Sequence, residues 1–261
     1  MCGIFGFALA QAVPMVKVFR LLEKLEVHQY PNEPKPVGGY GAGIAVLDNE
    51  GSIIWEKVGR VSDSPARSLS EILDVSEAAV LVGHVRMPSP EFIETAKFRE
   101  TAQPYVVEID PSLTIVSVHN GKVENYEELR EQLSEEHVLE SEKVQLIDSE
   151  VIPHYFEDLL NETDDVNEAL YMLFCALQGS NAIAMLQTDE ENTFLHLIHK
   201  GKTRGLTVWT NEKSEVIFCS RKEPLIEEFS KMLSKGKFME KISIPYREDA
   251  GLKLSYQLAP K

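Results

Sequence analysis

A cysteine stands at position 2 of this sequence and is followed at once by the apolar run Gly-Ile-Phe-Gly-Phe-Ala-Leu-Ala. Such a start fits a secretion signal, a buried strand that carries a thiol, or a nucleophile at the end of the chain. A secretion signal begins with positive charge, whereas the first basic residue here is Lys17. The buried strand and the terminal nucleophile therefore remain as the two interpretations.

The nucleophile interpretation rests on the chemistry of a terminal cysteine. An initiator methionine is usually removed when the next residue is small, which would leave Cys2 with a free α-amine. That amine has a pKa of about 7.7–8.0 and can act as a base near neutral pH. A free thiol has a pKa of about 8.5 and needs little help to form the reactive thiolate. Cys2 would then combine nucleophile and base, although a lone cysteine is more often a small buried hydrophobe.

Charge and composition exclude several classes of partner. The 261 residues carry a formal net charge of −16, which would repel phosphate backbones and anionic lipids. No stretch approaches the roughly 18 apolar residues of a membrane span. The three cysteines are too widely spaced for a disulfide framework or a thiol metal site. We therefore expect a cytoplasmic protein that binds no nucleic acid, membrane, metal or cofactor, and that forms a single domain over residues 2–261.

Strand and helix patterns are mixed along the chain. Val-, Ile- and aromatic-rich stretches bounded by turn residues predict strands at residues 4–9, 43–47, 52–58, 78–85, 113–118, 181–187, 193–199, 206–210 and 215–219. Helical periodicity predicts helices at residues 13–25, 125–133, 151–160, 167–177 and 223–233. Asn125 and Glu128 are expected to cap the second of these helices, and the proline-rich residues 31–36 to form a surface loop. Many strands are joined by short turns, which favours an α+β fold of antiparallel sheets with helices on their faces.

Five short motifs occur in the first 152 residues, and their order is informative. They are Cys-Gly-Ile-Phe-Gly at residues 2–6, Gly-His-Val-Arg at 83–86, Ala-Gln-Pro-Tyr at 102–105, His-Asn-Gly at 119–121 and Asp-Ser-Glu-Val-Ile at 148–152. In order and rough spacing this set resembles the class II glutamine amidotransferases, which are N-terminal-nucleophile hydrolases. The resemblance covers residues 2–160, and residues 161–261 would complete the same domain. It implies a four-layer αββα sandwich with two stacked antiparallel sheets.

The resemblance also implies residues that grip the two charged ends of glutamine. Arg86 would clamp the α-carboxylate, because its planar fork can hold two oxygens in a way that lysine cannot. Asp148 would pair with the α-ammonium group. The alternatives are a surface ion pair for Arg86 and a helix N-cap for Asp148.

Asn120 and Gly121 would form the oxyanion hole. The Asn120 amide and the Gly121 backbone N–H would face the oxygen on which charge develops in the tetrahedral intermediate. The ordinary meaning of Asn-Gly is a tight turn, and the two interpretations are compatible. His84 and His119 are expected to be structural and neutral, and Cys175 and Cys219 to have no catalytic role.

Two stretches depart from the family pattern. Residues 87–90 read Met-Pro-Ser-Pro where many members carry Trp-x-Thr or Tyr-Ser-Thr, so only Ser89 keeps a hydroxyl for the substrate carboxylate. Two prolines stiffen this loop and remove two donors. Residues 38–43, GGYGAG, replace an Arg-Gly turn, and they lack the spacing and the following lysine of a phosphate loop.

The expected function is hydrolysis of L-glutamine through a Cys2 γ-glutamyl thioester, with ammonia passed to a separate synthase chain. Known members usually fuse this domain to such a synthase, and no second catalytic domain fits into this sequence. One alternative is a stand-alone hydrolase of another γ-glutamyl or amide substrate, and another is a catalytically silent regulatory module. The expected partners are L-glutamine, a synthase subunit and further copies of the chain in a homo-oligomer.

Overall fold

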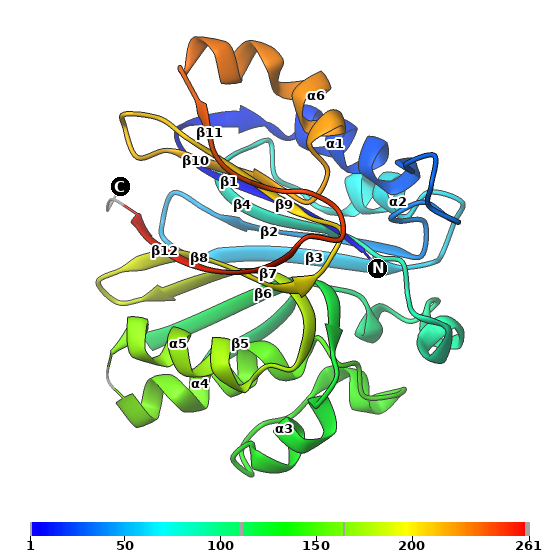
Figure 1. Ribbon diagram of the computed structural model, residues 1–261, viewed down its shortest axis with the longest axis vertical. Helices are drawn as coiled ribbons and strands as arrows, with labels where there is room; N and C mark the ends of the chain where they lie inside the picture. Colours follow the sequence, from blue (N-terminus) through cyan, green and yellow to red (C-terminus); the bar gives the residue numbers. More distant parts are fainter. Residues whose placement is uncertain (1, 110–111, 164, 259–261) are drawn as a thin grey trace.

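Two β-sheets are stacked face to face in the computed structural model, and helices cover the outer face of each (Figure 1). The structure describes residues 2–109, 112–163 and 165–258, so the expected removal of Met1 falls outside the described residues. No helix in these ranges is long and apolar enough to cross a membrane.

The first sheet has seven strands, and every neighbouring pair is antiparallel. Its spatial order is β11 (Met239–Ile244), β9 (Leu206–Thr210), β10 (Val216–Cys219), β1 (Gly3–Pro14), β4 (Glu77–Val85), β2 (Gly41–Leu47) and β3 (Ile53–Gly59). The strand that follows Cys2 is therefore central and paired on both sides. A residue at the start of this strand is therefore held in a fixed position.

The second sheet has five strands, also antiparallel throughout. Its order is β12 (Asp249–Leu258), β8 (Thr193–Lys202), β7 (Gly179–Asp189), β6 (Leu113–Val123) and β5 (Tyr105–Ile109). Strand β6 extends beyond the end of β5, whose last register pair on that side is Tyr105 with Ser117. The residues of β6 beyond Ser117 therefore have no β5 residue beside them in the sheet.

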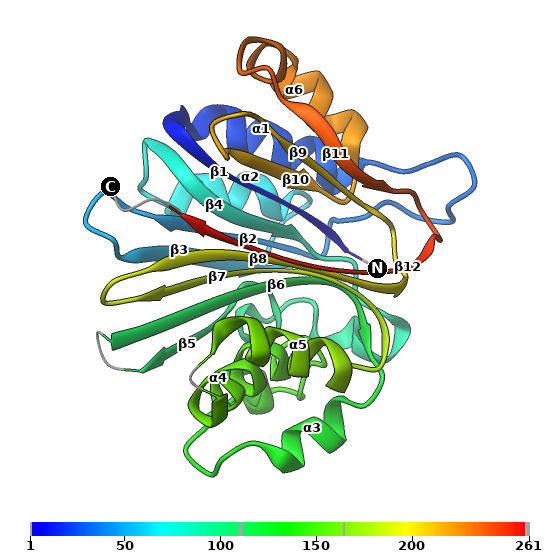
Figure 2. The ribbon, with the colours of Figure 1, turned by 60° about the vertical axis from the view of Figure 1, so that its left-hand side comes forward.

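Helices form the two outer layers (Figures 1 and 2). The seven-stranded sheet is covered by α1 (Met15–Val27), α2 (Pro65–Ile72) and α6 (Lys222–Lys235). The five-stranded sheet is covered by α4 (Val151–Thr163) and α5 (Val166–Ala176), and α3 (Tyr126–Gln132) packs beside α4. The expected four-layer αββα arrangement is confirmed.

Alternation along β1 decides which way Cys2 faces. Phe5 and Phe7 pack into the core between the first sheet and its helices, whereas Ile4 packs into the core between the two sheets. Side chains two residues apart in a strand share a face. Cys2 therefore faces the space between the sheets, at their common end.

The expected elements are found, with additions and corrections. The structure adds β5, β11, β12 and α2 to the elements that the sequence pattern predicted. The predicted capping by Asn125 is wrong. Its side chain donates to the carbonyl of Ala176 (3.1 Å) and accepts from the amide of Gln178 (3.0 Å). It does so because these backbone groups of the α5–β7 turn need partners. The loop at residues 31–36 is not wholly exposed, since Glu33 is buried against Arg221.

Candidate functional site

The sulfur of Cys2 is held by the backbone that follows β4. The amide N–H of Met87 donates to Cys2 Sγ over 3.3 Å, and the Met87 carbonyl oxygen lies 3.7 Å from the same sulfur. Register pairing of Gly3 with Val85 brings these two segments together. The end of β1 and the segment after β4 therefore fix the position of the sulfur together.

Cys2 opens onto a cavity of about 320 Å³. The cavity is also lined by Arg86, Ser89, Gly121 and Asp148, so five of the six candidate residues meet at one place. They come from the ends of β1, β4 and β6 and from the residues just before α4. The volume suits a small amino acid. The walls carry one buried cation, Arg86, and one buried acid, Asp148, besides the exposed side chains of Lys122, Glu124 and Lys202.

Arg86 is a buried cation, with a side chain only 4% exposed. Its guanidinium donates to the hydroxyls of Thr101 (2.7 Å) and Thr95 (2.8 Å) and not to a carboxylate. These threonines lie on two short 3₁₀ helices, η2 (Arg99–Thr101) and η1 (Pro90–Thr95). Burial lowers the pKa of Arg86, and nearby Tyr105, Cys2 and Asp148 raise it again. The surface ion pair is thus excluded, and a ligand carboxylate would supply the missing counter-charge.

Asp148 is the buried acid of the cavity. Its Oδ2 accepts the backbone N–H of Val123 over 2.9 Å. Burial raises its pKa from 3.8 to about 6, and the Val123 hydrogen bond and the charge of Lys122 only partly oppose this. Its ionised form therefore lacks full compensation, and a bound ammonium group would stabilise it.

The direction of the Gly121 N–H follows from its neighbours on β6. The N–H of His119 donates to Oε1 of Gln103 (2.6 Å), and that of Val123 donates to Asp148. Backbone N–H groups two residues apart in a strand point to the same edge. The Gly121 N–H is therefore directed at the cavity, between Gln103 and Asp148, both of which line it.

Position 121 accepts only glycine. A Cβ there would lie 1.9 Å from the carbonyl oxygen of Ser180, and the backbone φ is +155°. Close approach of β6 and β7 thus accounts for the glycine of the Asn-Gly pair. It is a strand residue, not the tight turn that the dipeptide alone suggests.

Asn120 stands between the cavity residues His119 and Gly121 but does not line the cavity itself. Its side chain is 0% exposed, and neither its amide nitrogen nor its oxygen has a hydrogen-bond partner among the described residues. It shares a face of β6 with Val118, which packs between the sheets, and this is the side that Cys2 faces. A buried amide without partners is costly, and a substrate oxygen at the sulfur is one group that could satisfy it.

The two histidines behave as expected. His119 contacts Ser149 Oγ (2.8 Å) and Asn181 Oδ1 (3.0 Å), and burial lowers its pKa to about 3. Burial, assisted by the charge of Arg86, lowers the pKa of His84 well below its ordinary value. Both rings are therefore neutral near pH 7, as expected.

One wall of the cavity is the segment that departs from the family pattern. Ser89 lines the cavity, and an ion pair between Glu91 of η1 and Lys122 of β6 (2.9 Å) joins the segment to the second sheet. The sequence pattern predicted neither this ion pair nor the hydrogen bonds of Thr95 and Thr101 to Arg86. Gln103 was noted only as a member of the Ala-Gln-Pro-Tyr motif. These residues act through contacts between distant segments, which no local pattern reveals.

The glycines at residues 38–43 do not form a phosphate loop. Gly41 and Gly43 belong to β2, and a Cβ on Gly43 would lie 2.0 Å from the carbonyl oxygen of Gln103. Close packing of β2 against the segment before β5 therefore explains the glycine at 43.

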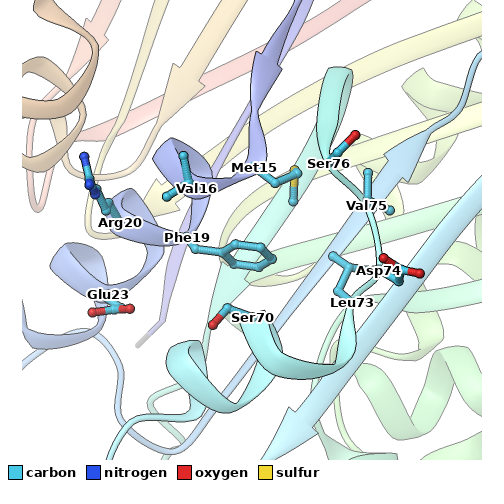
Figure 3. Close-up of a pocket in the computed structure, with 10 residues that line it drawn as sticks. All are labelled: Met15, Val16, Phe19, Arg20, Glu23, Ser70, Leu73, Asp74, Val75 and Ser76. Carbon is cyan, nitrogen blue, oxygen red and sulfur yellow. The ribbon is translucent and has the colours of Figure 1, made fainter.

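A larger cavity of about 620 Å³ lies between α1 and α2 on the outer layer (Figure 3). Met15, Phe19 and Leu73 contribute apolar surface, and Arg20, Glu23 and Asp74 stand among its lining residues. It contains no cysteine or histidine, and none of the candidate residues reaches it. The smaller cavity at Cys2 is therefore the candidate site.

A family model described as a glutamine amidotransferase domain matches residues 92–227. This range contains Asn120, Gly121 and Asp148 and begins after Cys2 and Arg86. Curated relatives include the isomerizing glutamine–fructose-6-phosphate aminotransferase of Geobacillus kaustophilus, 32% identical over 194 residues, and that of Chlamydia trachomatis, 36% identical over 202 residues. These matches cover 74% and 77% of this chain but 28% and 29% of the relatives, so the chain spans less than a third of their length.

Solved structures share the fold. An allosteric regulatory enzyme of purine biosynthesis aligns with a TM-score of 0.64 at 16% identity, and the glutamine phosphoribosylpyrophosphate amidotransferase of B. subtilis with 0.62 at 18%. Each alignment covers 100% of this chain and 50% of the other. At these identities the likeness concerns the sandwich architecture alone.

Proposed function

The chain belongs to the class II glutamine amidotransferase domains, and from this premise we propose that it hydrolyses L-glutamine to glutamate and ammonia. One observation carries the proposal. The Cys2 sulfur, a buried arginine without a carboxylate partner and a buried aspartate share one cavity of about 320 Å³. Glutamine presents a carboxylate, an ammonium group and a side-chain amide, and each of these groups finds its counterpart there.

In the proposed complex the substrate is held at its charged end. Arg86 binds the α-carboxylate through the guanidinium edge that its threonine partners leave available, and Ser89 donates a hydroxyl. Asp148 accepts the α-ammonium group. Two opposite charges on facing walls orient the amino acid so that its γ-amide reaches Cys2.

Removal of Met1 would make Cys2 the terminal residue and free its α-amine. The amine takes the thiol proton, and the sulfur attacks the carbonyl carbon of the glutamine side-chain amide. The amide oxygen becomes an oxyanion, which the Gly121 N–H and the Asn120 side chain stabilise. The C–N bond then breaks, and the α-ammonium of Cys2 returns its proton to the departing nitrogen as ammonia leaves.

Water completes the reaction. The γ-glutamyl thioester on Cys2 is attacked by a water molecule whose proton passes to the α-amine. The C–S bond then breaks and glutamate leaves, which restores the thiol. The balance is one glutamine and one water consumed for one glutamate and one ammonia.

We further propose that the ammonia is used by a synthase chain bound to this domain, because the curated relatives are much longer than the matched region. A reducing cytoplasm is the compartment that keeps such a thiol active. Association of several copies of this chain is compatible with both proposals.

The direct test is ammonia and glutamate release from L-glutamine by the purified protein. We expect release in equal amounts and its complete loss in Cys2→Ala. Cys175→Ala is the matched control, because this exposed thiol lies far along the chain on α5 and should leave the rate unchanged. Activity only on other amides would instead support the stand-alone hydrolase. A chain that forms no thioester with any amide would support a silent module.

A further inference from the structure

A cluster of two histidines and two carboxylates lies outside the cavity at Cys2. Its residues come from α4 and from the segment after α3, and both helices belong to the outer layer that Figures 1 and 2 show below the five-stranded sheet. Helix α4 contributes His154, Glu157 and Asp158, which share one face because they are three and four residues apart. The segment between α3 and the 3₁₀ helix η4 (Glu140–Lys143) contributes His137. Helix α4 begins at Val151, just after the cavity residue Asp148, and the six residue steps from Val151 to Glu157 rise about 9 Å along it.

The distances within this cluster match those between ligands of one small metal ion. Nε2 of His137 lies 3.1 Å from Glu157 Oε2 and 3.0 Å from Asp158 Oδ1. The three ligand atoms all lie within 4.8 Å of one another. Tetrahedral Zn²⁺ with bonds of about 2.0–2.1 Å separates its ligands by about 3.3 Å. The two distances from His137 Nε2 therefore lie within a few tenths of an ångström of this value, and the two carboxylate oxygens lie within 4.8 Å of each other.

Burial and charge also favour a cation. The side chains of His137 and Glu157 are each 6% exposed and that of Asp158 is 19% exposed. The charged groups that act on Glu157 are His137, Asp158 and Glu136. Two carboxylates with a third nearby thus share a single imidazole. Buried charges of this kind are paired or bind a metal.

Hydrogen bonds made outside the three ligand atoms orient each candidate ligand. Nδ1 of His137 lies 2.9 Å from Nδ1 of His154, and one of these two nitrogens donates to the other. In the tautomer in which His137 donates from Nδ1, its Nε2 presents a lone pair toward Glu157 and Asp158. This is the usual pattern of a metal-binding histidine, whose other nitrogen donates to an acceptor.

The carboxylates have matching supports. The oxygen of Glu157 that does not face His137 accepts from Asn161, and Oδ2 of Asp158 accepts the backbone N–H of Ser134 over 3.0 Å. Each carboxylate therefore directs one oxygen toward the shared point while its other oxygen is satisfied.

We propose that His137, Glu157 and Asp158 bind a divalent transition-metal ion, with Zn²⁺ as the ion best suited to one imidazole and two carboxylates. Water would complete the coordination. The ion would fix the segment of residues 133–139 onto α4, the helix that begins just after Asp148. The site contains no cysteine, which is why cysteine spacing gave no indication of it.

The test is zinc binding by untagged protein stripped with a chelator. Titration calorimetry should be performed in a Cys2→Ser background, because a terminal thiol and amine can themselves bind zinc. We expect one equivalent of Zn²⁺ per chain, lost in His137→Gln and in Asp158→Asn. Glu162→Gln is the matched control, an exposed carboxylate on the same helix, and should bind one equivalent. His154→Gln should weaken binding by about 10–100-fold.

X-ray absorption at the zinc edge is the second measurement, and it does not depend on any variant folding. Nitrogen and oxygen ligation with one imidazole is expected in the zinc-loaded wild-type protein after blocking of its thiols. Absence of saturable binding in the Cys2→Ser protein would overturn the proposal, and so would binding that His137→Gln leaves intact. In either case the cluster is a hydrogen-bonded network of His137, His154 and the two carboxylates. None of these readouts depends on glutamine hydrolysis.

Discussion

The backbone N–H of Met87 reaches the sulfur of Cys2 at 3.3 Å. The residue before it, Arg86, lines the same cavity from its position just after β4. The end of one central strand therefore positions both the nucleophile and the proposed clamp for the substrate carboxylate. A change at this strand end should affect binding and chemistry together, whereas changes at single side chains should separate them.

Substitution of Arg86 by lysine should weaken glutamine binding. Lysine keeps the charge, but its single nitrogen cannot replace the two nitrogens that bond separately to Thr101 and Thr95 and also hold a carboxylate by paired hydrogen bonds. Loss of about 2 kcal/mol, typical of one charge-assisted hydrogen bond, corresponds to a fall of about 30-fold in kcat/KM, mostly through KM. Steady-state kinetics with L-glutamine measures this.

A substrate analogue supplies the control for Arg86. 4-Aminobutanamide carries the amide and the amine but no α-carboxylate, so wild type and Arg86→Lys should use it equally poorly. If the variant lost as much activity on this analogue as on L-glutamine, Arg86 would act on the reacting end or on the fold, not on the carboxylate.

Asn120→Ala should reduce turnover with little effect on stability. Loss of one oxyanion donor costs about 10²–10³ in kcat. The Asn120 amide has no hydrogen-bond partner among the described residues, so the free energy of unfolding should change by no more than about 1 kcal/mol. Kinetics and urea unfolding of the same preparation give both values.

Asn181→Ala is the contrasting variant on the neighbouring strand. Asn181 bonds to His119 (3.0 Å) and to the Gln178 carbonyl (3.1 Å). Its removal leaves these groups without partners and should cost about 1–3 kcal/mol of stability. Equal stability losses in the two variants would mean that Asn120 makes structural contacts.

The mature chain should begin at Cys2. Only then is the α-amine free to act as the base, and intact-mass spectrometry should find the chain lighter by one methionine. A variant with alanine inserted between Met1 and Cys2 should retain the fold but lose turnover. Full activity in a preparation that retains Met1 would contradict the amine-base mechanism.

The sequence predicted more of the fold than of the site's supports. Central strands such as β1 and β4 are continuous apolar runs, and their position and type were evident. Strands β11 and β12 were missed because charged residues interrupt them at the sheet edges. Helix α2 carried a readable signal that was overlooked, since Ser64 caps it and Pro65 opens it.

The candidate site also contains some residues that the sequence predicted and others that it did not. Cys2, Arg86 and Gly121 follow from short motifs, because strand ends place them at one edge. Thr95 and Thr101 were not predicted, because their hydroxyls gain a role only when two 3₁₀ turns fold against the Arg86 guanidinium. Residues that hold other residues act through tertiary contacts, which the local pattern does not encode.

Asp148 should link activity and stability to pH. Its folded pKa of about 6 lies above the ordinary value of 3.8, mainly because of burial. The ionised form is needed to hold an ammonium group, so kcat/KM for L-glutamine should fall below about pH 6. Glutaramate, which lacks the amine, should show no such limb. An identical acid limb with both substrates would assign it to another group.

The raised pKa of Asp148 affects the stability of the fold in the opposite direction from its effect on activity. A raised pKa means that the folded state binds the proton more tightly. The fold is therefore favoured below pH 3.8 and loses this contribution as pH rises through about 6. Asp148→Asn removes the charge and can still accept the Val123 N–H. We expect it to be inactive on glutamine but more stable at pH 7.5, by at most about 3 kcal/mol. The gain should shrink toward pH 4 in urea unfolding, and a variant less stable than wild type at pH 7.5 would show that the buried charge is fully compensated.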